Sequence, residues 1–328
     1  MQPAVRDLAF KTKTGVDAYD RYYIDTMREM SKVNRRLYKQ GMMVGYNGLT
    51  FIFRQDSLNP VQTLELTVRT APNSWMMQNG FVKGKALWNE MQQLVLADNP
   101  SLSGKWHDFK CTMQISQIGE NLLDTVDADG TAFLGGEWNY STYVMPQHQV
   151  SDGTQIDPVT GLPIPVGEPL PADEFTACLF GENNVTRKSL LLAYQDSRAT
   201  VSLNQPNTPA DMPLSFFSLL TDSGSQEPEL AEVIMDENED PPYSLDHYPG
   251  TNANGGTATA VAYSAISVAE VDGRTSGFVA PCGLLEIEIA GFDSDGGAID
   301  KADLPSIDIL LHVAAGSYKG IAAIPMGQ

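Results

Sequence analysis

The sequence feature that most limits the possible folds is a series of short strand-like runs separated by glycine and proline. Ten runs are rich in β-branched and aromatic residues or alternate between apolar and polar side chains. They span residues 42–54, 61–70, 106–116, 131–145, 173–181, 188–203, 213–221, 258–270, 277–290 and 306–324. The chain also contains 28 glycines and 20 prolines, which favour turns. This pattern predicts a mainly β protein, an antiparallel jelly-roll β-sandwich with two inserted helices and long surface loops.

The run at 61–70 gives the clearest strand signal. Leu64, Leu66 and Val68 fall on one face, and the residues between them are polar or charged. A double jelly roll, with two sandwiches side by side, is the alternative architecture. It requires about sixteen strands, and the ten runs favour the single sandwich.

Two segments have helical periodicity instead. The first is residues 20–38, followed by Gly41 as a stop signal, and its apolar stripe consists of Tyr23, Met27, Met30 and Leu37. The second is residues 80–97, whose stripe consists of Phe81, Trp88, Met91 and Val95. Beyond residue 105 the pattern predicts strands and no third helix.

We expect a basic N-terminal segment with an amphipathic helix at 1–40 and a jelly-roll domain at 41–328. Two surface insertions interrupt that domain, at about 146–172 and 222–257. The first contains a proline-rich stretch, PVTGLPIPVGEPLP, which cannot form a hydrogen-bonded ladder. The second is acidic and rich in turn residues, which is typical of a long exposed loop.

Charge is distributed unevenly along the chain. The formal net charge is −20, from 21 Lys and Arg against 41 Asp and Glu. Residues 1–40 nevertheless contain nine basic and five acidic side chains, whereas residues 111–328 contain six basic and 31 acidic ones. Such a chain presents opposite potentials on two surfaces, and the basic start is the one suited to a polyanion.

No run approaches the length of a membrane-spanning helix, and the start of the chain lacks the basic-then-apolar pattern of a cleaved signal. We therefore expect neither a membrane span nor secretion. Three widely spaced cysteines argue against a disulfide framework and favour a reducing compartment.

The sequence gives little sign of catalysis. The motifs GxxxxGK[ST], HExxH and GxSxG are absent. Asp222-Ser223-Gly224 resembles the active-site loop of pepsin-like aspartic proteases, but that chemistry needs two such loops and only one copy is present. We therefore expect no enzymatic activity, and an aspartic-type hydrolase is the third-ranked function.

One acidic cluster has the composition of a weak calcium site. Asp293, Asp295 and Asp300 flank a glycine-containing turn, and calcium takes oxygen ligands from carboxylates. The cluster lacks the closing glutamate of an EF-hand loop. Calcium at this cluster is the one cofactor that the sequence suggests.

Three segments together resemble a known family. They are SKVNRRLYKQGM at 31–42, TAPNSW at 70–75 with FVKGKALWNEMQQ at 81–93, and HVAAGSYKGIAAIPM at 312–326. The likeness, which covers about a third of the chain, is to jelly-roll capsid proteins of small icosahedral viruses. Those of circular single-stranded DNA viruses from aquatic and environmental samples are the most similar.

The resemblance implies a structural protein of the virion that self-assembles, in many copies inside the host cell, into an icosahedral shell around the viral genome. It implies that the N-terminal segment faces the genome and that surface loops are available to a host receptor. The cations that would face nucleic acid are Arg6, Lys11, Lys13, Arg28, Lys32, Arg35, Arg36 and Lys39. This chain has only a diluted version of the dense basic arm found in many such proteins. The alternative function is a non-catalytic β-sandwich binding module, such as a carbohydrate-binding domain or a phage tail or fibre component.

Overall fold

The computed structural model divides the chain into two compact units. Unit one comprises Met1–Asn73, Thr112–Asn139 and Thr257–Gln328, and unit two comprises Ser74–Cys111 and Tyr140–Gly256. The structure describes residues 3–53, 61–104, 108–133, 138–145, 153–157, 160–168, 173–199, 259–267, 270 and 272–327. The predicted strand at 213–221 and the predicted insertion at 222–257 lie outside these residues.

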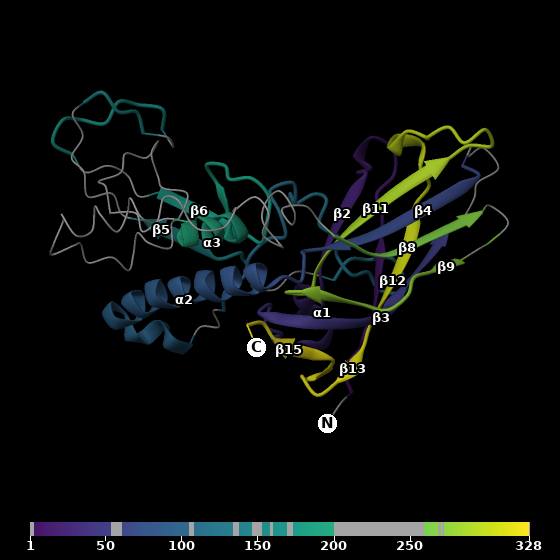
Figure 1. The fold of residues 1–328 in the computed structure, drawn as a ribbon, viewed down its shortest axis with the longest axis horizontal. Helices are drawn as coiled ribbons and strands as arrows, with labels where there is room; N and C mark the ends of the chain where they lie inside the picture. Colours follow the sequence, from purple (N-terminus) through teal and green to yellow (C-terminus); the bar gives the residue numbers. More distant parts are fainter. Residues whose placement is uncertain are drawn as a thin grey trace. The chain divides into compact units, whose positions relative to one another are not determined.

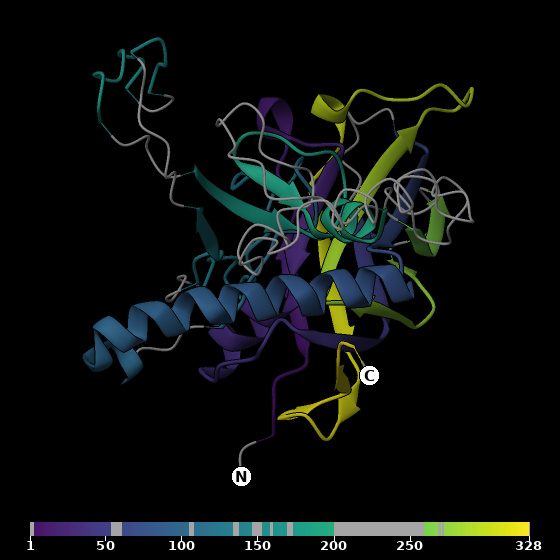
Figure 2. The same cartoon turned by 60° about the vertical axis from the view of Figure 1, so that its left-hand side comes forward.

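Unit one is built from two antiparallel sheets (Figures 1 and 2). The first has the order β1 (Asp7–Lys11), β12 (Ile307–Val313), β3 (Met42–Phe53) and β10 (Phe278–Pro281), and β9 (Asp272–Arg274) and β15 (Ala323–Pro325) also pair with β3. The second has the order β2 (Arg21–Asp25), β11 (Leu284–Phe292), β4 (Thr63–Thr70) and β8 (Thr259–Ser267). A short hairpin of β13 (Ala315–Gly316) and β14 (Gly320–Ile321) precedes β15. The predicted mainly β, antiparallel character is confirmed.

The eight strands on the main paths of these sheets pair in a nested order. In chain order they are β1, β2, β3, β4, β8, β10, β11 and β12. The first pairs with the last, β1 with β12, and the second with the seventh, β2 with β11. The third pairs with the sixth, β3 with β10, and the fourth with the fifth, β4 with β8. The pairs β3–β12 and β4–β11 then complete the two sheets.

Alternating side chains from both sheets bury one common core. In β4 the predicted face of Leu64, Leu66 and Val68 is fully buried, and β12 alternates in the same way. Residues from β1, β3, β10 and β11 join the same apolar cluster. Each fully buried aliphatic or aromatic side chain contributes about 1.5–3 kcal/mol to stability, so this core is the main source of the fold's stability.

The first predicted helix is shorter than expected. Residues 21–25 form β2, whose Tyr22 and Ile24 enter the core, and α1 spans only Thr26–Asn34. Asp25 begins the helix as its N-cap, because its carboxylate accepts a hydrogen bond from Arg28 N at 3.1 Å. The helix ends at Arg35, which adopts the left-handed conformation, and not at Gly41.

The other helices correct the sequence prediction further. Helix α2 (Trp75–Asp98) begins five residues before the expected start, where the Ser74 hydroxyl accepts a hydrogen bond from Met77 N. The prediction of a strand at 188–203 was wrong, because β7 (Arg187–Ser189) is followed by a third helix, α3 (Leu190–Ala199). The apolar run LLLAY is too short for its periodicity to distinguish a buried strand from a buried helix. Three 3₁₀ turns, η1 (Gly15–Asp17), η2 (Pro100–Gly104) and η5 (Lys301–Asp303), complete the described helical residues.

Unit two combines α2 and α3 with a three-stranded sheet of β5 (Thr142–Met145), β6 (Asp173–Cys178) and β7. Strands β6 and β7 are parallel. An aromatic cluster lies beside them, in which Phe81 packs on Phe109 at 5.4 Å and Tyr143 stacks on Phe175 at 5.2 Å between ring centroids. In the described residues this unit is not a second sandwich of the kind that a double jelly roll requires.

Two glycines let α2 approach the start of α3 closely. A Cβ atom on Gly80 would lie 2.8 Å from the Leu190 carbonyl oxygen, and one on Gly84 would lie 2.5 Å from a Leu190 methyl carbon. We expect Gly80→Val to lower the free energy of unfolding by about 2 kcal/mol, because overpacking against backbone forces the helices apart. Urea unfolding measures this effect. Gly119→Val is the control, since no atom lies within 4 Å of a Cβ at Gly119. Equal stability of the two variants would contradict the close packing.

Residues 1–40 are part of unit one, where they form β1, β2 and α1. Within the predicted insertion at 146–172, the described residues include a bridge between Ile156 and Pro163. No helix among the described residues is long and apolar enough to cross a membrane.

Candidate functional site

Residues 121–126, here called the edge strap, lie along one edge strand of each sheet in unit one. Tyr23 N in β2 donates to Asn121 O at 2.9 Å, and Leu123 N donates to Tyr23 O at 2.8 Å. Val126 N then donates to Ala9 O in β1 at 2.8 Å. Because β1 and β2 end their sheets, these bonds occupy backbone groups that an edge strand otherwise offers to another chain.

A buried ionic network fastens the edge strap to α1. The Glu29 carboxylate, whose side chain is 0% exposed, contacts Arg28 at 3.2 Å and Lys32 at 3.1 Å. It also accepts a hydrogen bond from Thr125 N at 2.7 Å. Asp124 pairs with the same two cations, each at 2.7 Å.

Arg28 and Lys32 were predicted to face nucleic acid. Their side chains are only 17% and 4% exposed, and both have carboxylate partners within the chain. Because Glu29 and Asp124 neutralise both cations within the chain, their presence is explained without a nucleic-acid partner. The spacing of a basic helix face could not reveal this, because Asp124 is 92 residues from Lys32 in sequence.

Asp25 forms a buried polar site beside this network. Its carboxylate accepts hydrogen bonds from Arg28 N, from Gln40 Nε2 at 3.2 Å and from Trp138 Nε1 at 3.1 Å. Burial raises the pKa of Asp25 to about 7, because the loss of solvation outweighs the Arg28 backbone hydrogen bond and charge, which lower it. Thr26 next to it accepts a hydrogen bond from the Tyr46 hydroxyl at 2.7 Å.

Two of the segments that carry the family resemblance meet after α1. The Tyr38 hydroxyl donates to Lys319 O at 3.1 Å, and Lys39 N donates to the Tyr318 hydroxyl at 3.0 Å. The Tyr38 and Tyr318 rings pack edge to face at 6.1 Å. The Lys319 ammonium lies within 6 Å of both rings and donates to Leu37 O. We call residues 35–39 and 318–319 the basic end.

The basic end brings together three predicted cations, Arg35, Arg36 and Lys39, and adds Lys319, which the sequence prediction missed. Lys319 lies on the β13–β14 hairpin, 280 residues from Lys39. In Figures 1 and 2 this hairpin and both ends of the chain lie toward the same end of unit one. The N-terminal segment lies beside the end of α1, since Val5 N donates to Asn34 Oδ1 at 2.7 Å.

The remaining predicted cations lie elsewhere in unit one. Arg6 accepts a backbone hydrogen bond from Val313 at 3.0 Å. Lys13 places its ammonium over the Tyr19 ring at 5.6 Å. Lys11 lines a cleft. The structure therefore distributes the eight predicted residues over several places, and nucleic-acid contact by those that are exposed stays a prediction.

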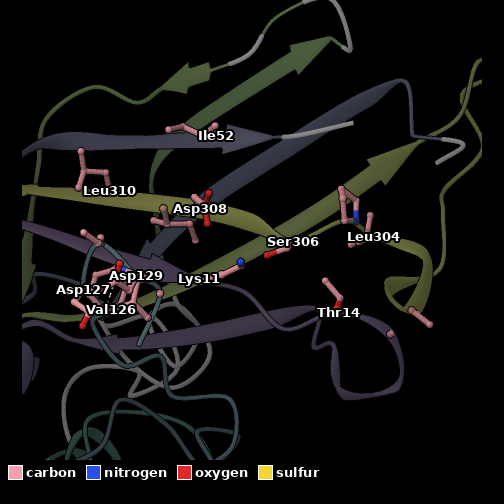
Figure 3. A pocket seen from close by; sticks show the side chains of 18 residues that line it. Lys11, Thr14, Ile52, Val126, Asp127, Asp129, Leu304, Ser306, Asp308 and Leu310 are labelled. Carbon is pink, nitrogen blue, oxygen red and sulfur yellow. Dashed lines mark hydrogen bonds between the residues drawn. The ribbon is translucent and has the colours of Figure 1, made fainter. Parts of the chain in front are cut away.

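The cleft beside Lys11 has a volume of about 750 Å³ (Figure 3). Its floor is the face of β1, β12 and β3 that points away from the core, with Lys11 and Asp308 as cross-strand partners. Residues 126–130 form one wall, and residues 304–306 belong to the lining as well. Asp127 in that wall accepts backbone hydrogen bonds from Asp129 and Thr131, so its carboxylate stabilises its own turn. The lining is mixed in charge and partly apolar.

The predicted calcium ligands do not come together. Asp293 accepts backbone hydrogen bonds from Asp295 at 2.9 Å and Gly297 at 2.7 Å, and Asp300 caps the 3₁₀ turn η5 through Ala302 N. Both carboxylates thus serve local backbone geometry. In the part of the chain that the structure describes, no group of three or more His, Cys, Asp or Glu side chains is placed to hold a metal ion.

A hydrogen-bonded chain of Thr50, His312 and Asp7 crosses three neighbouring strands. Thr50 Oγ1 lies 2.9 Å from His312 Nε2, and His312 Nδ1 lies 2.8 Å from Asp7 Oδ1. The order of groups is that of a nucleophile, base and orienting carboxylate. Thr50 is only 9% exposed, and the three residues come from β3, β12 and β1. We interpret the chain as a tie between strands, which no sequence motif indicates.

Cys111, Cys178 and Cys282 are buried, and none of the three forms a disulfide bond in the structure. Burial raises the pKa of Cys178 to about 12, which keeps this thiol protonated and unreactive. The aspartic-protease-like Asp222-Ser223-Gly224 lies outside the described residues.

Comparison of the chain with family models, curated proteins and solved structures gave no match. Function is therefore inferred from the residues and geometry of unit one.

Proposed function

We propose that the chain is a viral coat protein that self-assembles in many copies into an icosahedral shell around a genome, and that unit one is a jelly roll. A jelly roll is a long two-stranded antiparallel ribbon wound into two sheets. Such a ribbon pairs the first strand with the eighth, the second with the seventh, the third with the sixth and the fourth with the fifth.

The observation that carries the proposal is the nested pairing of the eight strands in unit one. All four pairs of the ribbon are present, as β1–β12, β2–β11, β3–β10 and β4–β8. The sheet orders β1-β12-β3-β10 and β2-β11-β4-β8 follow from winding that ribbon once. An arbitrary antiparallel arrangement of eight strands has no reason to satisfy every one of these pairs.

The position of the long connection also supports a structural role. The sequence of unit two and the edge strap both belong to the single stretch between β4 and β8. This is the closed end of the ribbon, where extra sequence does not interrupt any other strand pair. Because the extra sequence lies in one connection, the rest of the sandwich stays regular and can pack against copies of itself.

A shell protein needs no active site, and its specificity lies in the surfaces that meet. The edge strap bonds the backbone of Tyr23 in β2 and of Ala9 in β1, so these groups are not available for pairing with another chain. The nucleic acid would lie on the inner side of the shell, and surface loops would remain outside for a host receptor. The protein's location would be the virion.

The proposal predicts that nucleic acid recovered with the assembled protein is protected from nuclease. We expect fast-sedimenting material from cells expressing the full chain to retain its nucleic acid after nuclease treatment, because a closed shell excludes the enzyme. Disassembly in denaturant before treatment is the control and should make the same nucleic acid digestible. Complete digestion without denaturant would contradict enclosure.

A further inference from the structure

We propose that Arg35, Lys39 and Lys319 form a binding surface for the phosphate backbone of a nucleic acid. The inference rests on the proposed function and names the residues through which the shell protein would hold its genome. The proposed contact is therefore not residues 1–40 as a whole. It is the basic end, which residues 35–39 and 318–319 form together although they are far apart in sequence.

The first support is the absence of acidic residues from the sequence around the basic end. The chain has 41 Asp and Glu among 328 residues, an average of one in eight. Residues 30–55 and residues 309–328 contain none, and neither do residues 1–6. The fold brings these segments together through the contacts of Tyr38 with Lys319 and of Val5 with Asn34. A phosphate approaching here meets cations with no carboxylate in the same segments.

The second support is that these cations remain accessible. Arg35, Lys39 and Lys319 are all exposed. None of them takes part in an ion pair with another described residue. Lys319 donates one hydrogen bond to Leu37 O, and an ammonium has three donors, so further donors are left for phosphate oxygens. By contrast, Arg28 and Lys32 are held by Glu29 and Asp124.

The third support is backbone strain at two of these cations. Among the described residues only Arg35, Cys282 and Lys319 have positive φ without being glycine, and Arg35 and Lys319 both have φ of 51°. Glycine or asparagine adopts this conformation more easily, and glycine is the usual residue just after a helix. Side chains other than glycine and asparagine are therefore unfavourable at both positions. The Lys319 ammonium offsets part of this cost through its hydrogen bond to Leu37 O, so it is the charge of Arg35 above all that points to a role beyond folding.

This strain provides a sharp test, because asparagine removes each charge while tolerating the backbone. We expect the double variant Arg35→Asn, Lys319→Asn to bind a labelled oligothymidylate about tenfold more weakly than wild type at low salt. The slope of log affinity against log salt should fall by about 1.4, since each phosphate contact with a single strand contributes about 0.7. Fluorescence anisotropy across a salt series measures both. Adding Lys39→Gln should weaken binding further.

The matched control is Arg274→Gln, Lys301→Gln, which removes the same charge from exposed positions in unit one. The control should bind like wild type. Thermal unfolding should show that the asparagine variant is at least as stable as wild type, so that weaker binding cannot come from unfolding. The glycine pair Arg35→Gly, Lys319→Gly repeats the test if asparagine perturbs the fold.

An unchanged affinity and salt slope in the asparagine variant would overturn the proposal. An equal loss of affinity in the control variant would also overturn the proposal, because net charge would then explain the binding. Failure of the wild-type protein to bind the oligonucleotide would overturn it as well. Particle formation is recorded separately by light scattering. Assembly without oligonucleotide binding contradicts this inference alone, whereas binding without assembly contradicts the proposed function.

Discussion

Replacing Glu29 with alanine is expected to lower the free energy of unfolding by about 3–5 kcal/mol, the range for removing one partner of a buried ion pair. The Glu29 side chain is 0% exposed and contacts both Arg28 and Lys32. It also accepts the hydrogen bond from Thr125 N that holds the edge strap. The alanine variant leaves Lys32, only 4% exposed, with Asp124 as its remaining carboxylate.

Two matched variants separate charge from hydrogen bonding in this network. Glu29→Gln keeps an acceptor for Thr125 N and should lose less stability than Glu29→Ala. Asp124→Asn changes a carboxylate that is 40% exposed, so its loss should be below about 1 kcal/mol. Urea unfolding gives all three values, and limited proteolysis shows whether residues 121–126 become accessible. A Glu29→Ala protein as stable as wild type would refute the anchoring role.

The second large effect is a dependence of stability on pH through Asp25. Its pKa rises from 3.8 in the unfolded chain to about 7 in the fold. Well below pH 3.8 the carboxyl is protonated in both states, and the fold carries no penalty. As the pH rises toward 7, the unfolded chain ionises first and is stabilised. At 1.36 kcal/mol for each pKa unit, the fold loses about 4 kcal/mol by neutral pH.

Asp25→Asn tests this linkage by removing the titration. Asparagine retains an acceptor for Arg28 N, but its amide group faces the donors Gln40 and Trp138, so its absolute stability is not the readout. The difference in pH dependence between variant and wild type is the readout, measured by urea unfolding from pH 4 to 8. Trp138 fluorescence should report the same transition near pH 7, and Trp138→Phe identifies its signal. If the free energy of unfolding changes with pH in the same way in the variant and the wild type, Asp25 is not the cause of the pH dependence.

The sequence was most informative where one strand face is buried and the other is exposed. Leu64, Leu66 and Val68 alternate with polar residues, and that alternation alone determines which face of β4 enters the core. It was least informative where tertiary contacts override local pattern. Residues 21–25 share the helical spacing of α1, yet Tyr22 and Ile24 join the core as part of a strand. The apolar run LLLAY in α3 is so short that it fits both the two-residue period of a strand and the 3.6-residue period of a helix.

The candidate site was predictable only in part. The sequence identified Arg35, Arg36 and Lys39 as a basic stretch, and the fold gathers them at the basic end. Lys319 could not be added from local pattern, because only the pairing of β12 with β3 and β1 brings the following hairpin to Tyr38. Burial of Arg28 and Lys32 was likewise hidden, since it depends on the distant Asp124.

The most direct test of the central claim is the mass of the protein after expression of the full chain alone. Light scattering behind gel filtration, with negative-stain images of the leading fraction, measures it. A coat protein built on a jelly roll should form closed particles of uniform size, many times the mass of one 35.7 kDa chain. A monodisperse monomer, unchanged at high concentration and with added single-stranded DNA, would contradict the claim.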